Sequence, residues 1–293
     1  MVSITLSFTP LPFCEMNPLV DHIRLTLRAC FKGTRLSPSA FDSLLQALTC
    51  LAIGLRAAHL VDVCNVGSDR AVPLITQLRQ HPLCKSLVLL QFGQDYTFIC
   101  HRETLQSHLD TTLNKPEQRD YVDVRGKQGP PIKRSSPPPV LINWLQQRLL
   151  PFVNQKDDPF FLSRMVPYYM VALTGWLLEY PIIYCSHDED PNETTDNDLD
   201  REWDPWQVRP NCLGDRPLCL VRVWITHPHQ QRYMLLSFTY PKELTIANPV
   251  AMIQSKYQHR LLQVAHDDHS LEFIRGAHVD VSHETVTLDR VAL

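Results

Sequence analysis

The sequence predicts an α/β fold: a mixed sheet flanked by helices, with a helical segment at the N-terminus and an antiparallel part at the C-terminus. Strand-like and helix-like segments alternate through residue 185, which is typical of a sheet with helices on its faces. Beyond that residue the strand-like segments come in pairs, which favours an antiparallel extension of the sheet. A chain of 293 residues with 44% hydrophobic side chains can bury one core of this kind, and we expect a single domain over residues 1–293.

The expected helices are marked by start signals and by a 3.6-residue apolar period. Asn17-Pro18 and Ser37-Pro38 each place a polar residue before a proline, which is a typical helix start. Pro73 is compatible with its helix only in the first turn, and Pro167 begins or bends another helix. Helices are expected from residue 17, from residue 37, and over 69–80, 102–113, 141–153, 160–178 and 248–265.

Short runs rich in β-branched, aromatic and other apolar residues, bounded by turn residues, indicate the strands. Gly93-Gln94-Asp95 separates two such runs and predicts a hairpin-like turn. The expected strands are 57–63, 86–92, 96–100, 121–124, 181–185, 218–226, 232–238, 270–274, 278–281 and 285–288.

Two segments are expected to be exposed loops. The proline-rich loop, residues 126–139, contains three consecutive prolines. The acidic insert, residues 187–204, holds nine acidic residues and one arginine, and such a charge block is typically disordered because it repels itself. Two alternatives stay open for the acidic insert: a divalent-cation site, although the EF-hand order is missing, and contact with a basic patch on the protein's own surface.

Composition and motifs argue against several function classes. The net charge of −3 is not that of a broadly basic nucleic-acid binder, so no nucleic acid is expected as a partner. The N-terminus shows no secretory signal and no apolar run is long enough for a membrane span, so we expect a cytoplasmic or nuclear protein. No Cys-x-x-Cys, dinucleotide, phosphate-loop, Gly-x-Ser-x-Gly or His-Glu-x-x-His motif occurs. The cofactor is therefore unknown, no metal site is assigned, and enzyme status stays open.

The main candidate site is the junction between the strand 57–63 and the helix after it. Asp62 and Asn65 lie where the strand ends, and Gly67 permits close approach of the backbone to a ligand. Ligands of open α/β sheets bind outside the carboxyl ends of strands, where helix N-termini favour anions. The alternative is that Asp62 and Asn65 only cap and turn the chain.

Asp123 ends the strand 121–124 in a comparable position. If both strands are parallel in one sheet, Asp62 and Asp123 lie at the same edge, where two carboxylates could bind a metal or share acid–base chemistry. The alternative is that Asp123 pairs with Arg125 or is simply exposed.

His187 directly follows the strand 181–185. It would complete the same edge together with Ser163 and Arg164 from the preceding helix. The alternative for this histidine is a surface turn.

Several strings also carry a family resemblance. They are residues 61–68, Leu162-Ser163-Arg164, residues 175–184, Asn211-Cys212-Leu213 and the ending 284–293. In combination they resemble an uncharacterised animal protein family, represented by the human product of chromosome 1 open reading frame 74, from about residue 51 to the end. The departures are the N-terminal helical segment, the proline-rich loop and the enlarged acidic insert. The family has no established activity, so the resemblance implies a shared fold and places Asp62, Asn65 and Arg164 within the shared strings.

Two functions are compatible with these features. A non-catalytic interaction protein, which the sequence slightly favours, would hold a protein partner through the acidic insert or the proline-rich loop, and would show an exposed apolar patch near Trp203 and Trp206. The second function is a small-ligand-binding or enzymatic pocket at the sheet edge. The ligand-binding candidates are Asp62, Asn65, Gly67, Asp123, Arg164 and His187.

Overall fold

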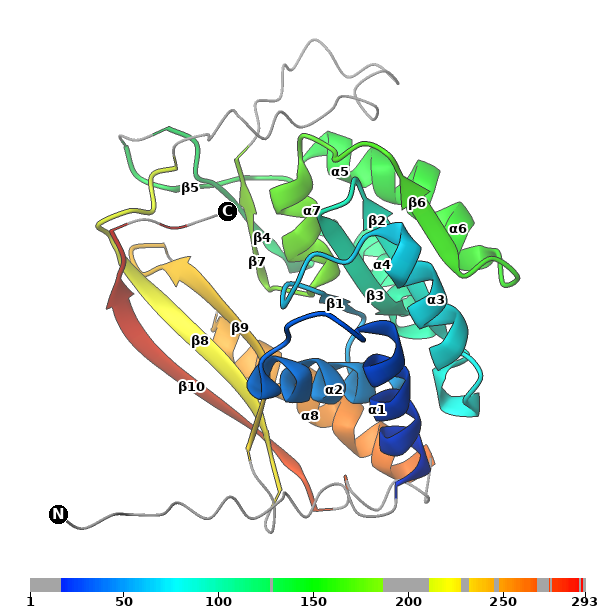
Figure 1. Ribbon diagram of the computed structural model, residues 1–293. Coiled ribbons are helices and arrows are strands. Elements are labelled where there is room, and N and C mark those ends of the chain that lie inside the picture. The colour runs from blue at the N-terminus through cyan, green and yellow to red at the C-terminus, as the bar shows by residue number, and fades with distance from the viewer. Residues whose placement is uncertain are drawn as a thin grey trace, which may run out of the picture.

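Figure 1 shows the computed structural model, which describes residues 17–126, 129–186, 211–227, 232–244, 248–267, 274, 276–289 and 291. The strands of this part of the chain form three sheets, with the orders β1-β3-β2-β6, β5-β4-β7 and β10-β8-β9. The predicted mixed α/β fold, with a helical N-terminus and an antiparallel C-terminal part, is confirmed.

The first two helices begin where the sequence places them. In α1 (Pro18–Cys30) the Asn17 side chain accepts a hydrogen bond from the Leu19 amide at 3.0 Å. In α2 (Pro38–Ala52) the Ser37 hydroxyl accepts from the Ala40 amide at 3.1 Å. Each cap satisfies an N–H group that has no partner inside its helix, and this fixes the helix start.

The first sheet holds β1 (Ala58–Leu60), β3 (Tyr96–His101), β2 (Leu87–Phe92) and β6 (Phe160–Ser163), in that order. β3 is antiparallel to β1 and to β2, and β6 is parallel to β2. β1, β2 and β6 therefore point in the same direction, and their carboxyl ends lie at one edge of the sheet. The predicted hairpin between β2 and β3 is confirmed.

Two helices cross between these strands. α3 (Ser68–Leu78) and the short 3₁₀ helix η2 (Pro82–Cys84) lead from β1 to β2. Pro73 lies in the second turn of α3, so the expectation that it occupies the first turn is wrong. The missing N–H costs one intrahelical bond, while the residues after it, Leu74 and Ile75, are fully buried and hold the helix on the sheet. After β3 come α4 (Arg102–Asn114) and the 3₁₀ helix η3 (Pro116–Gln118).

The single helix expected over 160–178 is wrong in its first half. Its first residues form β6, which pairs in parallel with β2 from Leu89↔Phe160 to Phe92↔Ser163. Only the second half is helical, as α7 (Met170–Leu177). The apolar run therefore divides into a strand that completes the sheet and a helix that covers it.

The second sheet holds β5 (Ile132–Lys133), β4 (Asp120–Asp123) and β7 (Ile182–Cys185). β4 is parallel to β7 and antiparallel to β5. Because β5 lies inside the proline-rich loop, that segment is not a loop throughout. A helical stretch follows it, made of α5 (Pro139–Trp144), the π-helical turn η4 (Leu145–Leu149) and α6 (Leu150–Asn154).

The third sheet is antiparallel and holds β10 (His278–Thr287), β8 (Pro217–Thr226) and β9 (Tyr233–Pro241). The two strands expected at 278–281 and 285–288 are one continuous strand, because β10 pairs with β8 along its whole length. α8 (Pro249–Asp267) lies between β9 and β10 in sequence and contacts β10. Of the expected strand 270–274, only residue 274 is described.

The first two sheets are buried on both faces by the same two layers. Successive residues of β2 belong to different hydrophobic clusters, Leu89 to the first and Leu90 to the second. In β7, Ile182 likewise belongs to the first cluster and Ile183 to the second. The first cluster contains side chains of α1, α2, α3, α8 and the third sheet, and the second contains side chains of α4, α5 and α7. Functional groups of these sheets are therefore accessible at the strand ends and not on the faces.

Candidate functional site

A pocket opens at the edge of the first sheet where β1, β2 and β6 end. This edge pocket has a volume of about 700 Å³. Its walls come from the first residue of α3, the end of β2, the β2–β3 turn and the end of β6. The residues that line it are Ser68, Gln91, Gly93, Gln94, Asp95, Tyr96, Leu162, Ser163, Arg164 and Val166. The carboxyl ends of strands are where α/β sheets present ligand sites.

A buried polar cluster fixes one wall of the edge pocket. The Val66 carbonyl accepts hydrogen bonds from the Gln91 side-chain amide at 2.9 Å and from the Thr97 hydroxyl at 2.8 Å. Gln91 also donates to the Thr97 hydroxyl at 3.0 Å. Both side chains are buried and hydrogen-bonded, so they hold the loop before α3 against the sheet without leaving an unpaired polar group.

Asn65 and Gly67 lie beside the same pocket. The Asn65 side-chain amide donates to the Asp95 carboxylate at 3.0 Å, which ties the loop after β1 to the β2–β3 turn. A Cβ atom on Gly67 would lie 2.6 Å from Asp69 Oδ1 and 2.9 Å from Gln94 Oε1. Glycine therefore lets these two polar side chains approach the backbone just before α3.

Arg164 supplies the positive charge of the edge pocket. It follows β6, and a hydrogen bond from the Gly93 amide to the Ser163 carbonyl, at 2.9 Å, joins the ends of β2 and β6 beside it. The Ser163 hydroxyl donates to the Met165 carbonyl at 2.8 Å and so fixes the turn on which Arg164 lies. Within the described residues the Arg164 side chain is exposed and has no hydrogen-bond or ion-pair partner. It is therefore available to bind an anion.

The expected common edge of Asp62 and Asp123 is wrong. Asp62 follows β1 in the first sheet, whereas Asp123 ends β4 in the second. Among the described strands, β1 pairs with β3 alone and β4 pairs with β5 and β7, so none of the sheets described contains both carboxylates. Asp62 is exposed and does not line the edge pocket.

Asp123 pairs with Arg125, which is the alternative that the sequence left open. Arg125 donates from its Nη2 to Asp123 Oδ2 at 2.6 Å, and its backbone amide donates to Oδ1 at 3.0 Å. Burial raises the pKa of Asp123, but the hydrogen bonds and the charge of Arg125 lower it by more than burial raises it. The pKa of Asp123 therefore lies below its usual value. A carboxylate held in this way serves as a local ion-pair partner.

His187 and the acidic insert lie outside the described residues, as do Trp203 and Trp206. Of the six candidates, the structure brings Asn65, Gly67 and Arg164 to the edge pocket. It also adds residues that the sequence analysis did not select, chiefly Gln91 and Asp95. Gln91 carried a signal, because it is the only polar residue of the apolar run 87–92.

A buried carboxylate elsewhere was also missed. Glu179 follows α7 with a positive φ of 62°, and its side chain is 1% exposed. It accepts hydrogen bonds from the Ala57 amide at 2.9 Å and from both Arg260 Nη atoms at 2.8 Å, and Lys256 lies 2.7 Å away. Burial raises its pKa, yet Lys256 and Arg260 lower it more, so the pKa lies well below its usual range. The group joins α8 to the start of β1 and is structural in character.

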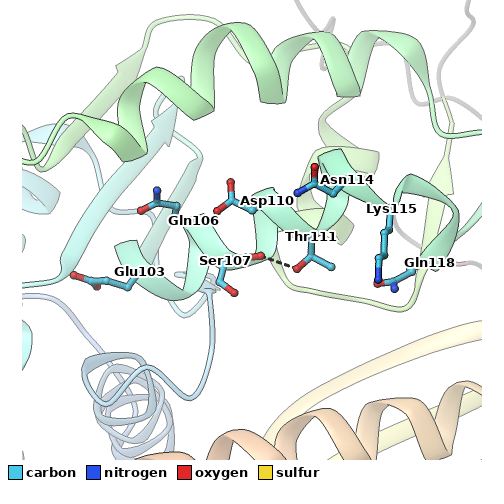
Figure 2. Close-up of a pocket in the computed structure, with 8 residues that line it drawn as sticks. All are labelled: Glu103, Gln106, Ser107, Asp110, Thr111, Asn114, Lys115 and Gln118. Carbon is cyan, nitrogen blue, oxygen red and sulfur yellow. Dashed lines mark hydrogen bonds between the residues drawn. The ribbon is translucent and has the colours of Figure 1, made fainter.

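A different hollow lies along the exposed face of α4 (Figure 2). Its volume is about 480 Å³, and its residues come from α4 and the short turn that follows. Figure 2 shows the side chains in a row along one helix, and its dashed line marks the bond from the Thr111 hydroxyl to the Ser107 carbonyl at 2.8 Å. Because the lining comes only from α4 and the turn after it, we do not regard this hollow as the site. Among the described residues, no group of three potential metal ligands occurs.

Fold and site together define an α/β protein with a polar pocket at the carboxyl edge of one sheet. Residues 28–293 match the family described as "Domain of unknown function (DUF4504)", and the protein belongs to this family. The match begins within α1, so the helix α2, which the resemblance treated as a departure, is part of the family region. No curated protein and no solved structure matches the chain. Within the described part of the chain, every helix is too short or too polar to cross a membrane.

Proposed function

We propose that the protein binds a small polar ligand with an anionic group in the edge pocket. The observation that carries this proposal is the convergence of the ends of β2 and β6, the start of α3 and the unpaired Arg164 side chain on one pocket of about 700 Å³. Pockets of roughly 300–1,000 Å³ that combine apolar walls with a few polar groups are the usual size for small-molecule sites.

The residues that line the pocket favour a ligand that carries an anionic group at one end and a hydrogen-bond donor at the other. Arg164 can donate two parallel hydrogen bonds to a carboxylate or phosphate. Ser68 begins α3, and no side chain caps this helix start among the described residues, so the helix dipole favours negative charge there. The Asp95 carboxylate, held by Asn65, would accept a hydrogen bond from a hydroxyl or amine of the ligand.

The alternative is an interaction protein without catalysis. Among the described residues, the most exposed large apolar side chains are Leu25 of α1 at 64%, Ile132 of β5 at 61% and Leu262 of α8 at 59%. They lie on separate elements. Of the two segments proposed to hold a partner, the acidic insert lies wholly outside the described residues and the proline-rich loop lies partly outside them. The edge pocket is therefore the better-supported function. We also propose that the chain is similar to the group represented by the human product of chromosome 1 open reading frame 74, because it carries strings such as residues 61–68 and 175–184.

A reducing location, the cytoplasm or the nucleus, is part of this proposal. The eight cysteines among the described residues are all free, and most of them are buried. Proteins of oxidising compartments tend to pair their cysteines, so this pattern supports the assignment.

Thermal-shift measurements test the binding proposal. Inorganic phosphate, small carboxylates and amino acids would be screened against the wild-type protein, Arg164→Ala and Arg28→Ala. Arg28 is an exposed arginine on α1, so its substitution makes the same change in charge away from the pocket. A ligand of the edge pocket raises the melting temperature of the wild type and of Arg28→Ala, but not of Arg164→Ala. Equal shifts in all three proteins would contradict the proposal.

A further inference from the structure

A second cavity, whose lining differs from that of the edge pocket, lies between the edge strands of the first and second sheets. This inter-sheet cavity has a volume of about 400 Å³. It is lined by Leu60 of the edge strand β1 and by Ile182 and Tyr184 of the edge strand β7. α7 contributes further wall residues, and Leu220 of β8 and Phe238 of β9 close it from the third sheet.

The walls of the inter-sheet cavity are apolar. The Tyr184 hydroxyl donates to the Thr239 carbonyl at 2.8 Å, so its polar end is already satisfied. The rings of Tyr180 and Phe238 lie 5.6 Å apart and present carbon surface. No charged side chain lines this cavity within the described residues. Such a lining favours a hydrocarbon or aromatic group over a polar one.

Tyr96 lines both the edge pocket and the inter-sheet cavity. It is the first residue of β3 and directly follows Asp95 in the β2–β3 turn. The polar space and the apolar space therefore adjoin at one side chain. A tyrosine hydroxyl is protonated near neutral pH, so Tyr96 can donate a hydrogen bond to a ligand that passes it, and burial and the charge of Asp95 raise its pKa.

We propose that the ligand is an amphipathic anion. Its carboxylate or phosphate head binds at Arg164 in the edge pocket, and its apolar chain or ring passes Tyr96 into the inter-sheet cavity. This inference rests on the proposed function, because it takes anion binding at Arg164 as given and adds the second half of the ligand. Charge at one end and apolar walls at the other select for a molecule that carries both.

Calorimetry with a chain-length series tests the inference. Acetate, butanoate, hexanoate and octanoate, and butyl and hexyl phosphate, would be titrated below their micelle concentrations. Each methylene that enters the cavity tightens binding about fourfold, because burying one methylene contributes about 0.8 kcal/mol. Comparison of the carboxylates with the phosphates of equal chain length shows which head group the protein selects.

Cavity-filling variants show where the chain lies. Val171→Trp, from α7, and Leu220→Trp, from β8, place a large ring in the inter-sheet cavity from opposite walls. Each is predicted to bind acetate as the wild type does and to lose the gain with chain length. Two variants are used because either substitution could disturb the fold. Only a variant whose melting temperature lies within a few degrees of that of the wild type is compared.

The outcomes separate this inference from the proposed function. If short anions bind through Arg164 but affinity is flat from acetate to octanoate, the inference is wrong and the proposed function stands. If affinity rises with chain length in the filled variants as it does in the wild type, the chain lies elsewhere and the inference is again wrong. If Arg164→Ala binds every anion as the wild type does, the proposed function itself is overturned.

Discussion

The side-chain amide of Asn65 lies 3.0 Å from the carboxylate of Asp95 and donates a hydrogen bond to it. These residues are distant in sequence, and their contact joins the loop after β1 to the turn between β2 and β3. It fixes the position of the Asp95 carboxylate in the edge pocket, which Arg164, after β6, also lines. The polar groups of the pocket are thus held by a contact between two loops and by the strand pairing beneath them.

Removal of this contact should weaken ligand binding more than it weakens the fold. Because both side chains are exposed, Asn65→Ala is expected to lower the free energy of unfolding by less than about 1 kcal/mol. The affinity for an anion that binds at Arg164 should fall several-fold, since Asp95 is no longer oriented. Urea unfolding and calorimetry measure the two effects. Asn114→Ala, at an exposed position on α4, is the matched control, and an equal loss of affinity in it would refute this role for Asn65.

Asp123→Ala is predicted to leave ligand binding unchanged. Its carboxylate lies in a different sheet from the edge pocket and is engaged by Arg125. An ion pair with a partly exposed arginine contributes less than about 1 kcal/mol, so stability should change little as well. A loss of affinity in this variant would show that Asp123 takes part in ligand binding and would contradict this prediction.

Glu179→Gln is predicted to be the most destabilising of these substitutions. It removes the only carboxylate that faces Lys256 and Arg260 within the described cluster and leaves their charges uncompensated near the core. Breaking a buried ion pair in this way typically costs about 3–5 kcal/mol. Guanidinium unfolding measures the change, and ligand binding by the folded fraction should persist, because Glu179 does not line the edge pocket. A loss below about 1 kcal/mol would show that the cluster is not structural.

The same carboxylate gives the protein a defined acid response. The pKa of Glu179 lies well below its usual value in the folded state, because Lys256 and Arg260 outweigh the effect of burial. Its contribution to stability is therefore complete above the unfolded-state pKa and is lost as the pH falls toward the folded-state pKa. Stability measured from pH 7 downward should fall more steeply in the wild type than in Glu179→Gln. Parallel curves would contradict this prediction.

Helix starts and turns could be predicted because their causes are local. Asn17 and Ser37 cap their helices through amides two or three residues away, and Gly93-Gln94-Asp95 forms a turn between adjacent strands. Such signals need no knowledge of the rest of the chain. The helix α3 also follows its predicted position closely, although Pro73 lies in its second turn and not, as expected, in the first turn.

Strand pairing could not be predicted in the same way. β1 pairs with β3 and β4 with β7, and nothing near Asp62 or Asp123 indicates these partners. The apolar run that contains β6 has no local feature that distinguishes a strand from a buried helix, and only its pairing with β2 makes it a strand. The edge pocket depends on these long-range pairings. For this reason Arg164 was selected beside His187 and within a shared string, while Asp95 was recognised only as part of a turn.

Mapping of ligand contacts by nuclear magnetic resonance tests the central claim most directly. Hexanoate and inorganic phosphate would be titrated separately into the ¹⁵N-labelled protein. The proposed site predicts that the largest amide shifts caused by either anion cluster at Ser68, Gly93, Asp95 and Arg164, and that Arg164→Ala removes them. Shifts concentrated instead on the exposed face of α4, at Ser107, Asp110 and Asn114, would place the binding site elsewhere and contradict the account.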